Sequence, residues 1–449
     1  MKLIGAERAL LDRVDARREA LVETVRELVR IDTVNPYSGE SPRGGDSLGD
    51  PSSGSPGAIP RGQAGEVAGQ DAVEAHLRAL GATTRRFEPP PDTYERAHVI
   101  GPRGRSWKGR PNLVGEWRFG GDGPHVIVVG HIDTVGVQGM ANPFGAELRD
   151  GRIWGRGTSD DKGGLAVGLA AIEALLTRRN ELRGRLTYLS VVDEECNGSG
   201  AGIIACTLEG IHGDAAISVD GEGLEITRGC GGVVTADIIV HGMGGHGSFG
   251  NGVNAVEKAI RLAEAALRFG DERRARLPHC LLNLGIFHGG TLHAVIPDRV
   301  RLGMNVVYDM SEAMEAKDRT GVRGGQLVWD ALERAVREAE AGDQWLRAHP
   351  SDLVWVKDLV PYEVSPDTPV VRDMRDAARD VMGVEPTVAK MTAWTDSCWL
   401  QVLADTPIVV FGPGEADVVH GPKEHVKVDQ LVVAAKAIAL YLYRALKVD

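Results

Sequence analysis

The sequence predicts an α/β fold, a doubly wound, mixed and mainly parallel sheet with a ferredoxin-like βαββαβ satellite domain inserted into it. Short apolar runs alternate with helical patterns in the first half of the chain and return near its C-terminus, which is typical of a parallel sheet covered by helices on both faces. The block between them has the order strand, helix, strand, strand, helix, strand, which is the split βαβ arrangement. With 449 residues the chain is also too long for one ordinary core.

The first half of the chain supplies most of the large domain. The charged N-terminal segment up to Val29 predicts an amphipathic helix and, lacking an apolar stretch, no secretory signal. The stretch 38–65 is rich in Gly, Ser and Pro and is predicted to be a low-complexity surface loop. A long helix is predicted at 163–179. Buried strands are predicted at 125–130, 185–192, 214–219 and 406–412.

The satellite block has its own pattern. Its strands are predicted at 233–242, 281–290, 299–309 and 352–360, and its helices at 254–269 and 326–342. The chain is therefore expected to leave the large sheet near Gly229 and to return after Pro361. Residues 1–229 and 362–449 would form one domain, and residues 230–361 would form the inserted satellite.

Composition excludes several classes of function. The formal net charge of -12 disfavours binding to nucleic acid or to an anionic membrane surface. The five cysteines are odd in number and scattered, without C-x-x-C spacing, so a reducing compartment is expected. No apolar stretch is long enough to span a membrane. The sequence thus predicts a cytoplasmic protein.

Acidic and histidine residues follow the predicted strands at their carboxyl ends. They are His131, Asp133, Asp193, Glu194, Glu195, Asp220 and His420. Open α/β sheets bind ligands at this edge, so these side chains are expected to converge. Asp160 and Asp161 precede the helix predicted at 163–179, where helix capping is the simpler explanation for either one alone.

Metal ions would resolve the repulsion among so many carboxylates. Imidazole and carboxylate ligands without thiolate suit zinc, cobalt or manganese, and one shared carboxylate would hold two divalent ions together. A single histidine such as His131 is more often a hydrogen-bonded core residue, but Asp133 two residues later could orient it as a ligand. The acidic run at 193–195 could be a solvated turn, or Glu195 could bind metal while Glu194 accepts a proton from metal-bound water.

A histidine in the satellite block is a weaker candidate. His246 lies in the glycine-rich segment GMGGHGSFGNG, where a turn histidine without function is the more common case. A glycine-rich turn nevertheless allows close approach to a ligand, and an imidazole could stabilise a developing oxyanion.

Several spaced motifs together resemble a known family. HIDTV, GRGTSDDKGG, DEECNGSG, GGHGSFGNGVNA and FGPGEADVVHGPKEHV occur in this order, with Asp220 between the third and fourth. They resemble the zinc-dependent exopeptidases and amidohydrolases that include acetylornithine deacetylase, succinyl-diaminopimelate desuccinylase and glutamate carboxypeptidase. The resemblance runs from the first helix to the C-terminus.

The resemblance implies a role for each candidate residue. Asp160 would bridge two zinc ions, His131 and Asp220 would complete the first, and Glu195 and His420 would complete the second. Asp133 would orient His131, Glu194 would be the general acid and base, and the peptide bond after Asp160 would be cis. The satellite would serve as a dimerisation and lid domain, with His246 reaching the active site of the partner subunit in a homodimer.

Departures from the family pattern affect substrate recognition. Relatives often carry, in the strand that here offers Asn305, an arginine that binds the substrate carboxylate, and Asn305 brings no positive charge. His293 stands where an asparagine is common before V-I-P. Asn305 and His293 are therefore candidate substrate-binding residues.

The leading hypothesis is hydrolysis of an amide bond in a small N-acyl amino acid or dipeptide-like compound by a metal-bound hydroxide, with Glu194 as general base. A dinuclear metal phosphoesterase is an alternative, although Asn305 offers no cation for phosphate. A non-catalytic small-molecule-binding relative is another alternative, which the complete set of proposed ligands disfavours.

Overall fold

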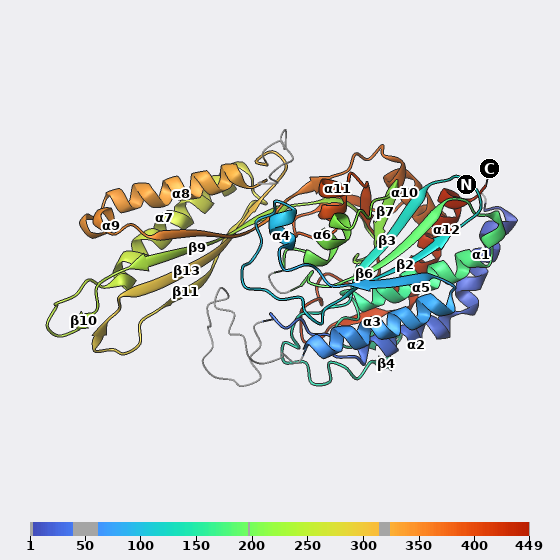
Figure 1. Ribbon diagram of the computed structural model, residues 1–449, viewed down its shortest axis with the longest axis horizontal. Coiled ribbons are helices and arrows are strands. Elements are labelled where there is room, and N and C mark those ends of the chain that lie inside the picture. Colours follow the sequence, from blue (N-terminus) through green and yellow to red (C-terminus); the bar gives the residue numbers. More distant parts are fainter. Residues whose placement is uncertain (1–2, 39–61, 196–197, 314–323, 449) are drawn as a thin grey trace.

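The computed structural model describes residues 3–38, 62–195, 198–313 and 324–448. It has two lobes, each with its own hydrophobic core (Figure 1). The larger lobe holds both ends of the chain, and the smaller lobe is built from residues between 232 and 359.

A large sheet, nine-stranded among the described residues, forms the centre of the larger lobe. In spatial order its strands are β1 (Thr83–Phe87), β2 (Asn112–Arg118), β6 (Arg185–Val191), β3 (His125–His131), β7 (Ala215–Ser218), β17 (Ile408–Val410), β8 (Ile226–Cys230) and β15 (Tyr362–Glu363), with β16 (Val388–Met391) beside β8. The four strands from β6 to β17 are parallel, and antiparallel pairs flank them. The predicted fold class is confirmed, and the four strands predicted for this sheet form its parallel centre.

Helices cover both faces of this sheet. They are α1 (Gly5–Ala16), α2 (Arg18–Val29), α3 (Gly62–Ala79), α4 (Thr93–Arg96), α5 (Lys162–Leu176), the short 3-10 helix η1 (Arg179–Glu181), α6 (Ala201–Leu208), α10 (Pro369–Met382), α11 (Cys398–Ala404) and α12 (Val428–Leu446). On one face, Gly168 of α5 lies against Tyr188, and Leu77 of α3 lies against Gly115, the strand partner of Tyr188. On the other face, Asn112 donates a 2.8 Å hydrogen bond to the backbone of α6. Asn112 and Gly115 point to opposite faces because side chains alternate along a strand.

The N-terminal segment differs from the prediction. It forms two helices, α1 and α2, instead of one, because Arg17 between them has a non-helical backbone (φ -107°, ψ 12°). The charge pattern continues unchanged through Arg17, so the sequence does not mark the break.

Part of the predicted 38–65 loop is also helical. Residues 39–61 lie outside the described residues, but α3 begins at Gly62, so the predicted loop was too long. Gly65, the last residue of the predicted loop, lies in α3 at a point of close packing. A Cβ at this position would lie 1.5 Å from the carbonyl oxygen of Asp32.

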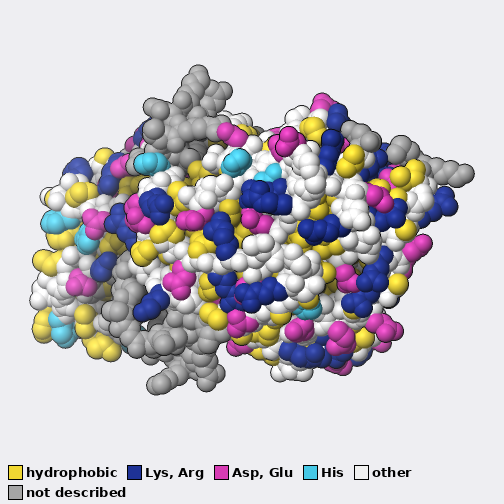
Figure 2. Space-filling view, turned by 45° about the vertical axis from the view of Figure 1, so that its right-hand side comes forward, with side chains coloured by type: hydrophobic (Ala, Val, Ile, Leu, Met, Phe, Trp, Pro, Cys, Tyr) yellow, Lys and Arg dark blue, Asp and Glu magenta, His cyan; other side chains and the backbone are white. Residues whose placement is uncertain are grey.

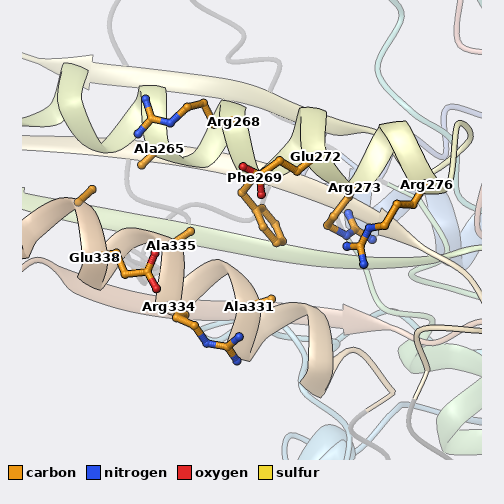
Figure 3. A pocket seen from close by; sticks show the side chains of 11 residues that line it. Ala265, Arg268, Phe269, Glu272, Arg273, Arg276, Ala331, Arg334, Ala335 and Glu338 are labelled. Atoms are coloured by element: carbon orange, nitrogen blue, oxygen red, sulfur yellow. The ribbon is translucent and has the colours of Figure 1, made fainter.

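The smaller lobe is the predicted split βαβ unit. Its elements are β9 (Gly232–His241), α7 (Ala255–Arg276), β11 (Leu282–Gly289), β13 (Arg299–Tyr308), α8 (Gln326–Ala341) and β14 (Asp352–Leu359). The sheet is antiparallel in the order β11-β13-β9-β14, which makes β11 an edge strand. A groove lined by Phe269, Arg273 and Arg334, among others, runs between α7 and α8 (Figure 3).

Smaller elements complete the fold. β10 (Gly245–His246) pairs with β12 (Val295–Ile296), and α9 (Gln344–Ala348) follows α8. A three-stranded sheet of β18 (His425–Lys427), β5 (Arg152–Trp154) and β4 (Glu147–Arg149) joins the segment before Asp160 to the segment after His420. Within the described part of the chain, no helix is both long and apolar enough to cross a membrane.

The contact of Gly65 gives a test of the fold. We expect Gly65→Ala to destabilise the protein by about 1–3 kcal/mol, because the added methyl group must displace the backbone at Asp32. Gly5→Ala, where a Cβ meets no atom within 4 Å, is the matched control and should cost nothing. Calorimetric melting temperatures measure both, and equal melting temperatures for the two variants would show that the α3 contact is wrong.

Candidate metal centre

The five predicted metal ligands come from one edge of the large sheet. His131 is the last residue of β3, Glu195 follows β6 and Asp220 follows β7. Asp160 directly precedes the segment leading into α5, and His420 lies in the loop between β17 and β18. Since β3, β6 and β7 are parallel neighbours, their carboxyl ends meet at the same edge.

Asp160 lies between the two histidines. Its Oδ1 is 2.9 Å from Nε2 of His131, and its Oδ2 is 2.9 Å from Nε2 of His420. Oδ1 of Asp220 is 3.7 Å from the same nitrogen of His131, and Oε2 of Glu195 is 3.2 Å from the same nitrogen of His420. The structure thus brings the five side chains together as two groups that share Asp160.

The ring of His131 is arranged as a ligand. Its Nδ1 is 2.9 Å from the carbonyl oxygen of Asp133, which can only accept, so Nδ1 carries the proton and Nε2 offers a lone pair. Nε2 is buried and has no hydrogen-bond partner among the described residues. The carboxylates of Asp160 and Asp220 approach this same atom, so a cation is needed between them. The residues therefore fit a divalent metal ion.

The electrostatics of the two groups lead to the same conclusion. Burial, followed by the charge of Asp160, raises the pKa of Glu195 to about 7 and also raises the pKa of Asp220. Hydrogen bonds to Asp160 and Glu195 raise the pKa of His420 to about 11. Burial would lower the pKa of His131, but the surrounding carboxylates outweigh it and raise that pKa well above its usual value. The acids are too crowded to ionise together unless positive charge is supplied.

Asp161 is a further candidate ligand that the prediction did not include. The peptide bond between Asp160 and Asp161 is cis, as the resemblance implied. Asp161 accepts a hydrogen bond of 3.2 Å from the backbone N–H of His131, while its buried Oδ1 has no partner in the described chain. Ligand atoms of Asp161, His131 and Asp220 lie within 4.8 Å of one another. The paired aspartates in TSDDKGG were the available sequence signal.

Asp133 links the ligands to the N-terminal segment. Its Oδ1 is 3.7 Å from Nδ1 of His131, farther than its own carbonyl oxygen. Its Oδ2 accepts hydrogen bonds from Nδ2 of Asn35 at 2.7 Å and from the backbone N–H of Glu195 at 3.2 Å. Nδ2 of Asn35 also lies 3.3 Å from the carbonyl oxygen of Glu195. Asn35 was missed because nothing in the sequence connects it to residues so distant.

Glu194, the predicted general base, is half-buried and lies close enough to the proposed ligands His131, Glu195 and Asp220 to interact with their charges. It forms no hydrogen bond with any residue that the structure describes. Burial raises its pKa well above the usual value, the charges of Asp396 and Glu195 contribute in the same direction, and His131 opposes them. A carboxyl group with a raised pKa can both accept and release a proton near neutral pH.

A buried network supports the loop that carries Glu194 and Glu195. Asp193 receives hydrogen bonds from Arg105 at 2.9 Å, Arg110 at 3.1 Å and Tyr94 at 3.2 Å. Arg110 also forms a bidentate ion pair with Glu66, with distances of 2.6 and 2.8 Å. Asp193, Arg110 and Glu66 are fully buried. This buried network holds Asp193, the residue directly before Glu194, in place.

A second buried pair holds the loops of Asp160 and His420. Glu424 pairs with Arg156, and its Oε1 accepts hydrogen bonds from the backbone N–H groups of Ser159 at 3.1 Å and Asp160 at 3.4 Å. Arg156 also donates to the carbonyl oxygen of His420 at 3.3 Å. One ion pair therefore sets the positions of a ligand from each group.

The satellite candidates lie outside this centre. His246 is exposed on β10, at the end of the smaller lobe farthest from the large sheet, and stacks on Phe249 with ring centroids 4.4 Å apart (Figure 1). His293 is exposed in the loop before β12. Asn305 is exposed on β13, where its Oδ1 accepts a hydrogen bond of 2.7 Å from Thr235. None of the three joins the metal ligands of its own chain in the described structure.

Comparison with known proteins identifies the family. The model of peptidase family M20/M25/M40 matches residues 127–444, which include all the proposed metal ligands and Glu194. The chain belongs to this family. Peptidases hydrolyse amide bonds, and the resemblance found in the sequence motifs is confirmed.

Individual M20 relatives extend the comparison. The chain is 28% identical over 353 residues to N-formyl-4-amino-5-aminomethyl-2-methylpyrimidine deformylase of Halalkalibacterium halodurans, covering 71% of this chain and 78% of the relative. It is 27% identical over 350 residues to succinyl-diaminopimelate desuccinylase of Nitrosomonas eutropha, covering 74% and 86%. Its fold matches the YXEP protein of Bacillus subtilis, a dinuclear metal-binding peptidase of the M20 family, with a TM-score of 0.58, 16% identity and coverage of 96% and 99%.

The contacts of Asn35 give a test of the centre. We expect Asn35→Ala to weaken metal binding about 10–100-fold, because Asp133 loses the donor that fixes its carboxylate beside His131 and Glu195. Asn180→Ala, at an exposed position of η1, is the control and should leave the affinity unchanged. Competition with a chromophoric chelator measures both affinities. Equal affinities in the two variants would remove Asn35 from the centre.

Proposed function

We propose that this M20 protein is a metal-dependent hydrolase that cleaves the amide bond of a small N-acyl amino acid or dipeptide-like compound. The observation that carries the proposal is the pair of ligand groups sharing Asp160, with the carboxyl group of Glu194 next to them and without a hydrogen-bond partner among the described residues. Two relatives support the reaction type, since a deformylase and a desuccinylase each remove an acyl group from nitrogen.

The proposed cofactors are two divalent ions, zinc first, with cobalt or manganese as alternatives. His131, Asp160 and Asp220 would hold one ion, and Asp160, Glu195 and His420 would hold the other, with Asp161 as a further candidate beside His131. When bound, two such ions polarise the substrate carbonyl group and make water nucleophilic at neutral pH.

The side chains of the centre would transfer the proton, position the ligands and stabilise the developing negative charge. Glu194 takes a proton from the attacking water and delivers it to the nitrogen of the leaving amine. Asp133, held by Asn35, keeps the loop of Glu195 beside His131. His246 of a second copy of the chain would stabilise the negative charge that develops on the carbonyl oxygen.

A homodimer through the satellite domain is part of this proposal. Large apolar side chains are exposed on α7 and around the edge strand β11, where Leu267 is 45% and Phe287 is 46% accessible. An edge strand with exposed apolar side chains is a natural site for pairing with a second copy. Such a contact would bring His246, which is remote from the metal centre of its own chain, to the metal centre of the second copy.

Substrate recognition is proposed to involve β13 and the loop before β12. Asn305, already bonded to Thr235, supplies no positive charge for a substrate carboxylate, and His293 is exposed nearby in sequence. Compounds with and without an α-carboxylate are therefore both candidates.

The proposed surroundings are the cytoplasm, without nucleic-acid or membrane partners. Cys206, Cys230, Cys280 and Cys398 form no disulfide bond with one another in the described structure, which is compatible with a reducing compartment. On the face shown in Figure 2, basic and acidic side chains are intermingled. A continuous basic surface of the kind that binds nucleic acid is not visible on this face.

A substrate panel tests the function. The zinc- and cobalt-loaded protein is incubated with N-formyl, N-acetyl and N-succinyl amino acids and amines, with dipeptides, and with a generic phosphate monoester. We expect amine release that EDTA abolishes and added metal restores. Phosphate release without amide cleavage would establish the phosphoesterase alternative, and bound metal without any hydrolysis would establish a non-catalytic relative.

The role of Glu194 gives a second test. Glu194→Gln should retain the bound metals but lower the turnover number about 10²–10⁴-fold, because the amide cannot accept the proton of the attacking water. Glu209→Gln, at the exposed residue directly after α6, is the control. Metal analysis and initial rates on the best substrate of the panel measure the effect. A full rate in Glu194→Gln would assign the base to another residue.

The dimer gives a third test. Phe287→Glu should convert the dimer to a monomer, because it places a charge on the proposed contact. Val384→Glu is the control and should not, because Val384 is exposed on the larger lobe, away from the proposed contact. Light scattering after size exclusion measures the mass.

Mixing two inactive variants then checks the role of His246. A mixed dimer of His246→Ala and Glu194→Gln contains one complete centre and should regain part of the activity. A monomeric wild type, or mixed variants that stay inactive after subunit exchange, would contradict the proposal.

A further inference from the structure

A second cluster of metal-binding side chains lies in the satellite domain. His279 and Cys280 lie between α7 and β11, and Asp309 directly follows β13. One ligand atom of each lies within 4.8 Å of the others. Nε2 of His279 is 2.8 Å from Oδ2 of Asp309. The cluster combines a nitrogen, a sulfur and an oxygen donor from two separate segments.

The backbone holds these two segments together independently of the cluster. The N–H of Val307 donates a 2.8 Å hydrogen bond to the carbonyl oxygen of Leu281, so the end of β13 is tied to the residue after Cys280. The N–H of Cys280 donates to the carbonyl oxygen of Leu277 at 2.9 Å, which closes a turn at the end of α7. The three side chains therefore meet on a fixed framework.

The carboxylate of Asp309 is oriented in advance. Its Oδ1 accepts hydrogen bonds from the backbone N–H of Ser311 at 2.8 Å and from the hydroxyl group of Ser311 at 2.6 Å. Its other oxygen faces His279. The adjacent Glu312 is held by Arg273, a residue that also lines the groove between α7 and α8 (Figure 3), so Glu312 already has its counter-charge.

The cluster is buried at its cysteine and accessible to solvent at its histidine and aspartate. Cys280 is fully buried, whereas the side chains of His279 and Asp309 are 44% and 27% accessible. An ion can thus enter from solvent between the imidazole and the carboxylate and reach the thiol beneath them.

We propose that His279, Cys280 and Asp309 form a binding site for one zinc ion, separate from the proposed catalytic centre. Zinc binds all three donor types at about 2.0–2.3 Å in tetrahedral geometry, so the ligand atoms of one ion lie roughly 3.3–3.8 Å apart. The three ligand atoms already lie within 4.8 Å of one another, and the partly exposed side chains of His279 and Asp309 can close the remaining distance by rotation. The ion would fasten the end of α7 to the end of β13.

Cobalt substitution tests this site without measuring activity. Thiolate coordination gives Co²⁺ a charge-transfer absorption in the near ultraviolet, and none of the ligands proposed for the catalytic centre is a cysteine. We expect this absorption in the full-length protein titrated with Co²⁺, and we expect Zn²⁺ to displace it. Metal analysis should find one equivalent more in the wild type than in Cys280→Ser.

Three variants make the assignment specific. Cys280→Ser should abolish the absorption, and Cys196→Ser, which removes the cysteine directly after Glu195, is the matched control and should retain it. His279→Gln, at a half-exposed position that should not affect folding, should weaken cobalt binding at least tenfold. An absent absorption, or one that persists in both Cys280→Ser and His279→Gln, would overturn the site whether or not the catalytic proposal holds.

Discussion

The crowding of carboxylates at one edge of a parallel sheet is the constraint on which the rest of the structure depends. Asp160, Asp161, Glu195 and Asp220 lie close together around two imidazoles, and burial disfavours the ionised form of each acid. Positive charge from the two imidazoles, and from the proposed metal ions, relieves this repulsion. The topology creates this situation, since parallel strands end at the same edge of the sheet.

Buried ion pairs keep this edge rigid from outside the ligand set. Arg110, Glu66 and Asp193 anchor the loop after β6, while Arg156 and Glu424 anchor the loops of Asp160 and His420. Isolated buried charges are costly, but a fully paired network with several hydrogen bonds is tolerated and holds its members in one arrangement. The ligands therefore do not rely on a metal alone to set their positions.

Features that depend on short stretches of sequence were predicted, whereas contacts between residues far apart in the sequence were missed. The parallel strands, the split βαβ order and the residues at strand ends follow from periodicity and short motifs, so His131, Asp160, Glu195, Asp220 and His420 could be selected and the structure brings them together. Asn35, Arg110 and Glu424 could not be selected, because their partners are far away in the sequence and only the folded chain brings them close. Composition also misled at Gly65, where a residue typical of loops instead permits close packing.

The position of the satellite within the chain affects the order of biosynthesis. β17 lies between β7 and β8 in the large sheet, although it is encoded after the whole smaller lobe. As the ribosome extends the chain, the smaller lobe has all its strands before the larger lobe receives this central one. His420 emerges later still. The sheet of the larger lobe therefore stays incomplete until translation is nearly finished, and the proposed metal ligands can come together only at that last stage.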